Sequence, residues 1–295
     1  MNTAKFFKKK LDFRREIAPV GAVLSSAGAA GARKIPLNNI FAIAGVCIKE
    51  LYRRKDFYVL FVLTALMTLV MGSANFFNED KVVRYVKELC LFLVWVSSIV
   101  IAVTTTARQI PAEKENRTIF PLLAKPVTRN EFVVGKFLGC WLASGLALVV
   151  FYSFFAIVSG TREHFWPVLN YFQAITLHWF MLGIIVALAL LGSIIFAAPS
   201  SNNTITFVLV TAILLLGRHL QKIALQFNEP LQSIVYALYF LIPHLEWAFD
   251  MRYLIVHNWD LINWAAWAGA LLYASIYSAL ILTGVCVLFR RKAVN

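Results

Sequence analysis

The sequence predicts an all-α integral membrane protein with six transmembrane helices, an N-terminal amphipathic elbow helix, and a re-entrant or interfacial helix between spans five and six. Apolar residues make up 60% of the 295 positions and charged residues only 15%, against about 25% charged in soluble proteins. Five apolar runs without interior charge are long enough to cross a hydrocarbon core of about 30 Å. Ten-residue alternating strand patterns are absent, so we expect the spans to be helices, which satisfy the hydrogen bonds of the backbone inside the bilayer.

Positive charge is distributed unevenly among the loops between these runs. The ratio of Lys/Arg to Asp/Glu is 12 to 4 before the first run, 3 to 3 in 75–88, 6 to 3 in 108–136, 1 to 1 in 160–172, 3 to 4 in 218–263 and 3 to 0 in 290–295. Lys and Arg concentrate in cytoplasmic loops, so we expect both termini and residues 108–136 in the cytoplasm. That topology requires an even number of spans, which a sixth, shorter one completes. The net charge of +13 therefore reflects topology, and we expect no nucleic-acid partner.

Residues 1–36 are expected to form a basic, flexible cytoplasmic tail. They contain three lysines at 8–10 and an Ala/Gly/Ser-rich piece at 21–32 that cannot hold a core. Two interpretations stay open: the basic residues bind anionic lipid headgroups, at about 1 kcal/mol each, or they only determine topology. A cleavable signal peptide is not expected, because the first apolar run of spanning length starts near Phe57.

Residues 37–54 have the apolar period of an amphipathic helix. Lys49, Glu50 and Arg53 occupy its polar side, and basic residues follow at 53–55. This pattern is typical of an elbow helix that lies in the membrane interface before it turns into span one. The apolar side consists of Leu37, Ile40, Phe41, Ala44, Cys47, Ile48 and Leu51.

The spans follow in order, at about 57–74, 89–107, 137–159, 173–198, 204–222 and 264–289. Near the end of span two, the hydroxyls of residues 104–106 are expected to bond to carbonyls one turn earlier. Trp179 is expected at the outer interface of span four, with His178 as a satisfied interfacial histidine. The uncharged sequence APSSNN at 198–203 predicts a turn, so that span five starts close to Thr204.

An outer segment at 230–250 precedes the last span. Its 14-residue apolar run, 230–243, lies between prolines and is too short to cross the bilayer, which favours a re-entrant or interfacial helix. Pro243, His244, Glu246 and Asp250 form a candidate outer gate that could meet a substrate. Interfacial solvation and helix capping explain the same charges equally well.

The sequence contains no motif for catalysis or metal binding. A P-loop requires GxxxxGK[ST], whereas the one Gly-Lys pair, Gly135–Lys136, is followed by Phe137. No HExxH or GxSxG motif occurs, and the four cysteines stand singly without a histidine at ligand spacing. We therefore expect no catalytic residue, no metal and no cofactor in this chain, and no nucleotide hydrolysis of its own.

A charged stretch lies between two long apolar runs at residues 113–139, EKENRTIFPLLAKPVTRNEFVVGKFLG. It also contains two prolines and a short apolar ridge. This stretch resembles the loop between spans two and three in permeases of type-2 ATP-binding-cassette (ABC) transporters. The elbow helix with Lys49, Glu50 and Arg53 is similar to a segment before span one in that family. Residues 242–250, IPHLEWAFD, are similar to its segment between spans five and six. Together the resemblance covers most of residues 37–290.

The resemblance implies a six-span permease of the bacterial inner membrane, an exporter that pairs with a second permease, identical or different, and two ABC ATPase subunits carrying ATP and Mg. It also implies that loop 108–136 holds a coupling helix that docks in a cleft of the ATPase. In that loop Ile119, Leu122 and Leu123 form the apolar ridge, and Lys125–Pro126 ends the helix. The coupling residues are Glu113, Glu115, Arg117, Thr118, Ile119, Leu122, Leu123, Lys125, Pro126 and Arg129. Gly135 and Gly139 would permit close helix packing as the chain returns to the bilayer.

Two other functions stay open at this point. A permease-like subunit could transmit force or assemble a membrane complex without moving a substrate. A membrane-embedded enzyme acting on lipids would need clustered His, Asp or Glu at one face, and only the loose group at 244–252 approaches that. The apolar spans are compatible with lipids, drugs, peptides or polymers as substrate.

Overall fold

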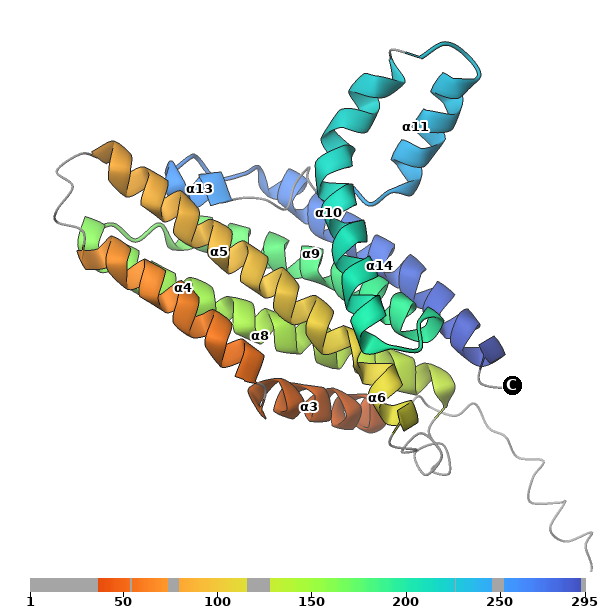
Figure 1. Cartoon of the computed structure of the whole chain (residues 1–295). Helices are drawn as coiled ribbons and strands as arrows, with labels where there is room; N and C mark the ends of the chain where they lie inside the picture. Colours follow the sequence, from red (N-terminus) through yellow and green to blue (C-terminus); the bar gives the residue numbers. More distant parts are fainter. Residues whose placement is uncertain are drawn as a thin grey trace, which may run out of the picture. The chain divides into compact units, whose positions relative to one another are not determined.

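The computed structural model describes residues 37–53, 55–73, 80–115, 128–225, 227–245 and 252–292, and residues 38–295 form one compact unit. Every regular element within these ranges is a helix, which confirms the all-α class (Figure 1). The helices are α3 (Leu37–Arg53), α4 (Lys55–Ser73), α5 (Asp80–Ala107), α6 (Gln109–Glu115), α8 (Arg129–Glu163), α9 (Val168–Ile195), α10 (Pro199–Ala224), α11 (Leu231–Leu241), α13 (Arg252–Val256) and α14 (Trp264–Lys292).

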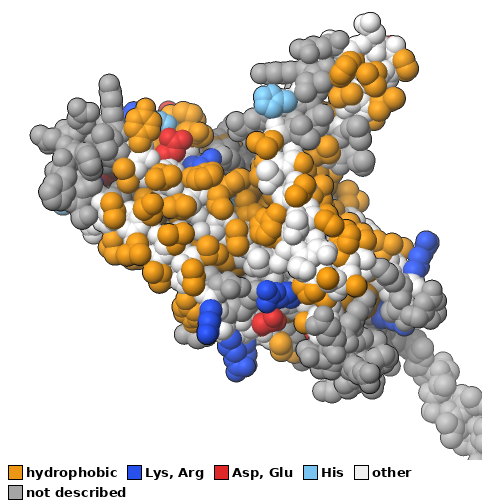
Figure 2. Space-filling view, viewed as in Figure 1, with side chains coloured by type: hydrophobic (Ala, Val, Ile, Leu, Met, Phe, Trp, Pro, Cys, Tyr) orange, Lys and Arg blue, Asp and Glu red, His pale blue; other side chains and the backbone are white. Residues whose placement is uncertain are grey.

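Four stretches of helix are long and apolar enough to cross a membrane: Arg84–Glu113, Arg129–Glu163, Val168–Ile195 and Trp264–Arg291. Shorter apolar helices, Phe57–Val70 and Pro199–Leu215, lie within α4 and α10. Figure 2 shows hydrophobic side chains across the middle of the visible face, with charged side chains toward its ends. The chain is therefore a multi-pass membrane protein, while the number of six spans stays a prediction.

Helix α9 lies at the centre of the bundle. It packs against α5, α8, α10 and α14, and its most apolar stretch is 67% buried, against 17% for that of α14. The sequence of α9 contains no charged residue and is apolar around its whole circumference, as a buried helix requires. Helix α14 instead leaves most of its surface for lipid or another subunit.

The helix bundle has a basic end and an opposite end. The basic end comprises α3, α6, the start of α8 at Arg129 and the end of α14 at Lys292. The opposite end comprises the start of α5, the end of α8 and the starts of α9 and α14.

Helix α8 runs over 35 residues, from Arg129 to Glu163, and contains the whole of the expected span 137–159. A capping box starts it: the Thr128 hydroxyl accepts the Glu131 N–H at 3.3 Å, and the Glu131 carboxylate accepts the Thr128 N–H at 3.1 Å. His164 ends it in the left-handed conformation, with φ 52°. The apolar run is shorter than the helix because the charged residues at the two helix ends are capped or paired within the protein.

Helix α5 likewise extends beyond the expected span 89–107, because it starts at Asp80. Lys87, which the sequence places in an outer loop, is buried in the helix and forms an ion pair with Glu163 of α8. At the other end, the hydroxyls of Thr104 and Thr106 donate to the carbonyls of Val100 and Ala102 at 2.8 and 2.7 Å, as expected. After a turn at residue 108 the chain continues as α6.

The expected turn at 198–203 is wrong in extent, because α10 begins at Pro199 rather than near Thr204. Proline suits the first turn of a helix, since its fixed φ is already helical and its missing N–H is not needed there. Asn202 is fully buried and stabilises this start: its Nδ2 donates to the Ala189 carbonyl at 3.0 Å, and its Oδ1 accepts the Thr206 hydroxyl at 3.1 Å. These side-chain bonds keep the polar stretch helical.

Trp179 and His178, expected at the membrane interface, lie inside the helix bundle. Because α9 starts at Val168, Trp179 is 11 residues, or about 16 Å, along the helix. The Trp141 Nε1–H donates to the Trp179 carbonyl at 2.9 Å and the Trp179 Nε1–H donates to the Trp141 carbonyl at 3.1 Å, so both indoles are satisfied inside the bundle. His178 is 1% exposed and is bonded to Ser98 at 2.8 Å. It is satisfied, as expected, but in the core.

Between α10 and α14 the structure describes two short helices. Helix α11 packs against α10 and covers Leu231–Leu241, within the apolar run expected to be re-entrant or interfacial. Helix α13 packs against α5 and α9 and buries Leu254, Ile255 and Val256. The membrane placement of both stays a prediction.

Candidate functional site

The expected coupling loop is described at its two flanks. Glu113 and Glu115 lie in α6, and Arg129 starts α8. The remaining coupling residues, Arg117, Thr118, Ile119, Leu122, Leu123, Lys125 and Pro126, lie outside the described residues, and their role stays a prediction. The structure therefore defines the base of the loop.

A buried ion pair closes that base. Lys136 of α8 is 4% exposed and pairs with Glu113 of α6. The Lys136 Nζ also donates to Gln109 Oε1 at 2.9 Å and lies 5.6 Å from the centre of the Phe132 ring. A buried ammonium needs such partners because its desolvation is costly. The flanks of the loop, 23 positions apart in the sequence, are thus joined.

The same network reaches helix α3 through Gln109. The Gln109 Nε2 donates to the Glu50 carboxylate at 3.0 Å, and the Cys47 thiol donates to Gln109 Oε1 at 3.4 Å. The amide oxygen faces the ammonium and the amide nitrogen faces the carboxylate, which is the orientation that the charges demand. We name Cys47, Glu50, Gln109, Glu113 and Lys136 the basal cluster.

The electrostatics of the basal cluster combine one ammonium with two carboxylates. A hydrogen bond with the Cys140 thiol holds the pKa of Cys47 below its ordinary value, against the raising effect of burial and with help from the Lys136 charge. Lys136 is therefore the cation on which the polar groups of α3 and α6 converge. The arrangement joins α3, α6 and α8 through buried polar contacts.

Two glycines of α8 bring α3 close to the basal cluster. A Cβ on Gly139 would lie 2.7 Å from the Cβ of Cys47 and 2.8 Å from the Cα of Ala44. A Cβ on Gly135 would lie 3.0 Å from the Cβ of Ile43. Small residues at this spacing allow two helix backbones to approach closely. The structure thus places Gly135 and Gly139 against α3.

The polar residues of α3 differ in their surroundings. Lys49 and Arg53 are exposed, whereas Glu50 is half-buried and bonded to Gln109. The buried side of α3 consists of Ile40, Ala44, Cys47 and Leu51. Glu50 therefore faces the bundle, and the two basic residues face outward.

Arg129, predicted to flank the ATPase contact, binds the end of α14. Its Nη1 donates to the Arg290 carbonyl at 3.1 Å, and the Arg290 Nε donates to Asn130 Oδ1 at 3.0 Å. Beside these bonds, the rings of Phe132 and Phe289 stack with centres 5.8 Å apart. The second flank of the loop is therefore fixed to the last helix.

At the opposite end, two of the four candidate gate residues are described. Pro243 is buried, and the His244 N–H donates to the Tyr273 hydroxyl of α14 at 3.1 Å. Glu246 and Asp250 lie outside the described residues. Whether the group meets a substrate stays a prediction.

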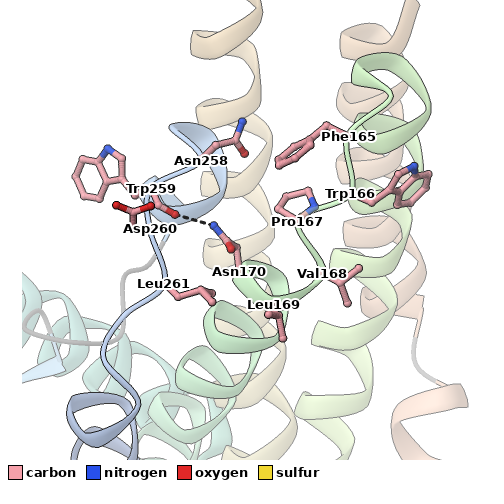
Figure 3. A pocket seen from close by; sticks show the side chains of 10 residues that line it. All are labelled: Phe165, Trp166, Pro167, Val168, Leu169, Asn170, Asn258, Trp259, Asp260 and Leu261. Atoms are coloured by element: carbon pink, nitrogen blue, oxygen red, sulfur yellow. Dashed lines mark hydrogen bonds between the residues drawn. The ribbon is translucent and has the colours of Figure 1, made fainter.

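A pocket of about 390 Å³ opens at this end between the loops that precede α9 and α14. Figure 3 shows Phe165 and Pro167 on one wall and Asn258 and Trp259 on the other. Asn170 connects the two walls, because its side-chain amide donates a hydrogen bond to the Trp259 carbonyl at 2.9 Å. The exposed indoles of Trp166 and Trp259 are typical of a membrane interface rather than of a catalytic pocket.

Sequence reasoning did not single out Gln109 or Lys136. Lys136 directly precedes the expected span three, and Gln109 stands between Arg108 and an apolar pair, so both read as ordinary loop residues. The sequence feature that could have indicated their contact is a polar residue at the edge of each apolar run, Gln109 after span two and Lys136 before span three. Two such residues on consecutive spans face the same end of the membrane.

Comparison with known proteins gives one family. Residues 41–294, which extend from α3 to beyond the end of α14, match the family model described as "ABC-2 family transporter protein". No curated protein matches the chain.

Proposed function

The chain belongs to the ABC-2 transporter family, and from that premise we propose that it couples ATP hydrolysis by a separate ATPase to substrate export. The family makes it a type-2 ABC permease, a membrane transport subunit. In the proposed complex, two ABC ATPase subunits bind ATP and Mg, and a second permease, identical or different, completes the transport path. The complex is proposed to lie in a bacterial inner membrane.

The basal cluster is the observation that supports coupling. Glu113 and Lys136 join the flanks of the loop, and Gln109 extends the link to Glu50 of α3. Arg129 adds α14 through the Arg290 carbonyl. A push on the loop at 116–127 would therefore act directly on α8 and, through α6, on α5. The same contacts would pass it on to α3 and α14.

The proposed mechanism is rigid-body tilting. When two ATPase subunits close on ATP, they move the coupling loop, and its base cannot yield without breaking the buried Lys136–Glu113 pair. The helices then tilt together and open a path along the seam with the second permease. This chain transmits force, and the nucleotide chemistry takes place in its partner.

The proposed orientation places the basic end in the cytoplasm together with both termini. Arg53, Arg129, Arg290 and Arg291 all lie at that end. Lys and Arg next to spans are retained on the cytoplasmic side. This orientation lets the loop meet a soluble ATPase.

The test is co-purification from membranes with a tagged chain. Leu122→Pro should abolish recovery of the ATPase subunit while leaving the amount of chain in the membrane unchanged, because proline breaks the docking helix. Leu122→Met, which keeps an apolar side chain of similar size, is the matched control. Undiminished recovery with Leu122→Pro would refute docking through this loop.

Transport itself needs a second measurement. Reconstituted vesicles with the intact complex should show ATP-dependent movement of a substrate and hydrolysis that the substrate stimulates. Docking without any flux or stimulation would instead fit the alternative, a permease-like subunit that transmits force or assembles a membrane complex.

A further inference from the structure

A groove of about 380 Å³ runs between α8 and α14 toward the basic end. Its lining is mostly apolar, with Val134 from α8 and Ala279, Leu282, Thr283, Cys286 and Val287 from α14. Asn130 and Arg290 line it as well, and they lie where α8 starts and α14 ends. The groove therefore combines an apolar trough with a polar, cationic rim.

The length of the groove matches the depth of one leaflet. From Ala279 to Arg290 the helix advances 11 residues, or about 16 Å at 1.5 Å per residue. Half of a hydrocarbon core of about 30 Å is about 15 Å. An acyl chain in the trough would thus reach the bilayer midplane when its headgroup lies at the rim.

The rim carries three guanidinium groups that can bind an anion. Arg290 and Arg291 are exposed, and Arg129 is half-exposed next to Arg290. Among the residues that the structure describes, no ion pair joins any of these three to a carboxylate. The nearest acid along α8, Glu131, is buried and engaged in the capping box with Thr128.

We propose that this groove is a binding site for an anionic phospholipid, with one acyl chain between α8 and α14 and the phosphate at Arg290, Arg291 and Arg129. The apolar trough selects a lipid over a free phosphate, and the charge of the rim selects an anionic lipid over a zwitterionic one. Such a lipid would stabilise the junction of α8 and α14 at the foot of the coupling loop. The site depends on the membrane position of these helices and not on transport or on ATPase docking.

Binding can be measured on the purified full chain by native mass spectrometry, with phosphatidylglycerol and phosphatidylcholine as probes. Phosphatidylglycerol should bind at least tenfold more tightly. Arg290→Gln and Arg291→Gln should each weaken it about fivefold, which is the contribution of one basic residue near an anionic membrane surface. Arg84→Gln is the matched control, because Arg84 is an exposed arginine at the opposite end. Equal affinity for both lipids, or equal losses for Arg84→Gln and Arg290→Gln, would overturn the proposal.

A second variant tests the trough separately from the rim. Cys286→Trp fills the groove and keeps every arginine, so it should also abolish selective binding of phosphatidylglycerol. Retained binding would show that headgroups only adsorb to the arginines, and competition by glycerol phosphate at equal concentration would show a free-anion site. Either result overturns the proposal. Gel filtration of each variant shows whether it is folded.

Cys286 also reports on the occupant of the groove. The other three cysteines, Cys47, Cys90 and Cys140, are buried, so a membrane-permeant maleimide should label Cys286. Bound lipid predicts slower labelling in phosphatidylcholine nanodiscs that contain phosphatidylglycerol than in nanodiscs without it. Rapid oxidative cross-linking of Cys286 between two chains would show that a second copy covers the groove and would refute the lipid site.

Discussion

The two ends of the bundle each bury a lysine, and they hold it in different ways. Lys87 at the opposite end is 5% exposed and pairs with Glu163, whose side chain is 29% exposed and so within reach of water. Lys136 at the basic end is 4% exposed and pairs with Glu113, whose side chain is 17% exposed. Lys136 is also bonded to Gln109, which continues to α3.

A lysine–glutamate pair between neighbouring helices therefore has two uses in this molecule. The Lys87–Glu163 ion pair connects only α5 and α8. The basal cluster around Lys136 makes a junction of α3, α6 and α8, because Gln109 binds the lysine and Glu50 at once. We therefore expect changes at Lys136 to affect both stability and ATPase docking, and changes at Lys87 to affect stability alone.

The largest effect is expected from Lys136→Met. The substitution leaves the carboxylate of Glu113 at the base of the loop without the Lys136 ammonium, and breaking a buried pair in this way costs about 3–5 kcal/mol. The free energy of unfolding, measured by denaturation in mixed micelles, should fall by that amount. Recovery of the ATPase on the tagged chain should fall with it.

The double variant Lys136→Met with Glu113→Leu separates the two effects. Replacing both members of a buried ion pair by apolar side chains is often neutral for stability. We expect the free energy of unfolding to return close to the wild-type value, while ATPase recovery stays low because α8 and α6 have lost their polar link. If Lys136→Met costs no more than Lys87→Met, the two ends are equivalent and the contrast between them is wrong.

The second effect in size concerns the contact that brings α3 to the basal cluster. Gly139→Ala places a Cβ 2.8 Å from the Cα of Ala44, a backbone atom, so α3 must move. Overpacking of this kind costs about 1–3 kcal/mol, and ATPase recovery should fall because Glu50 moves with α3. Gly284→Ala is the matched control, since nothing lies within 4 Å of its Cβ. The control should gain up to about 1 kcal/mol from helix propensity, and a loss of similar size for both variants would exclude close packing as the cause.

The class of the fold could be predicted from composition and from the apolar runs, but the helix ends could not. Hydropathy stops at the first charge, so it marks span three from residue 137 and does not show that the helix begins at Arg129. The capping box of Thr128 and Glu131 was present in the sequence three residues apart, and it is the better guide to this start. The same reasoning applies to Pro199 in α10.

The candidate site could be predicted only in its location. Charge counting pointed to residues 108–136, and the spacing of Gly135 and Gly139 suggested close packing. The partner of each polar residue could not be inferred, because Gln109 lies 59 positions from Glu50 and 27 from Lys136. Those contacts depend on how three helices pack, and a single sequence carries no local signal for that.

A smaller effect is expected at the opposite end from Lys87→Met. Glu163 loses its partner but is exposed enough to be hydrated, so the cost should be about 1–2 kcal/mol. ATPase recovery should equal that of the wild type, measured in the same co-purification. Lower ATPase recovery with an unchanged amount of chain in the membrane would show that the two ends are mechanically coupled. The Lys87 pair and the basal cluster would then not differ in function.

The smallest effects come from the two ends of α8, where they should have opposite signs. Thr128→Ala removes the N-cap at the basic end and should cost about 1 kcal/mol of unfolding free energy. His164→Gly relieves a left-handed conformation at the opposite end and should add about 0.5–1 kcal/mol. Because Thr128 is the last residue before the flank of the loop becomes helical, only its substitution should lower ATPase recovery. Equal recovery in both variants would mean that the loop is positioned by the basal cluster alone, with no contribution from the cap.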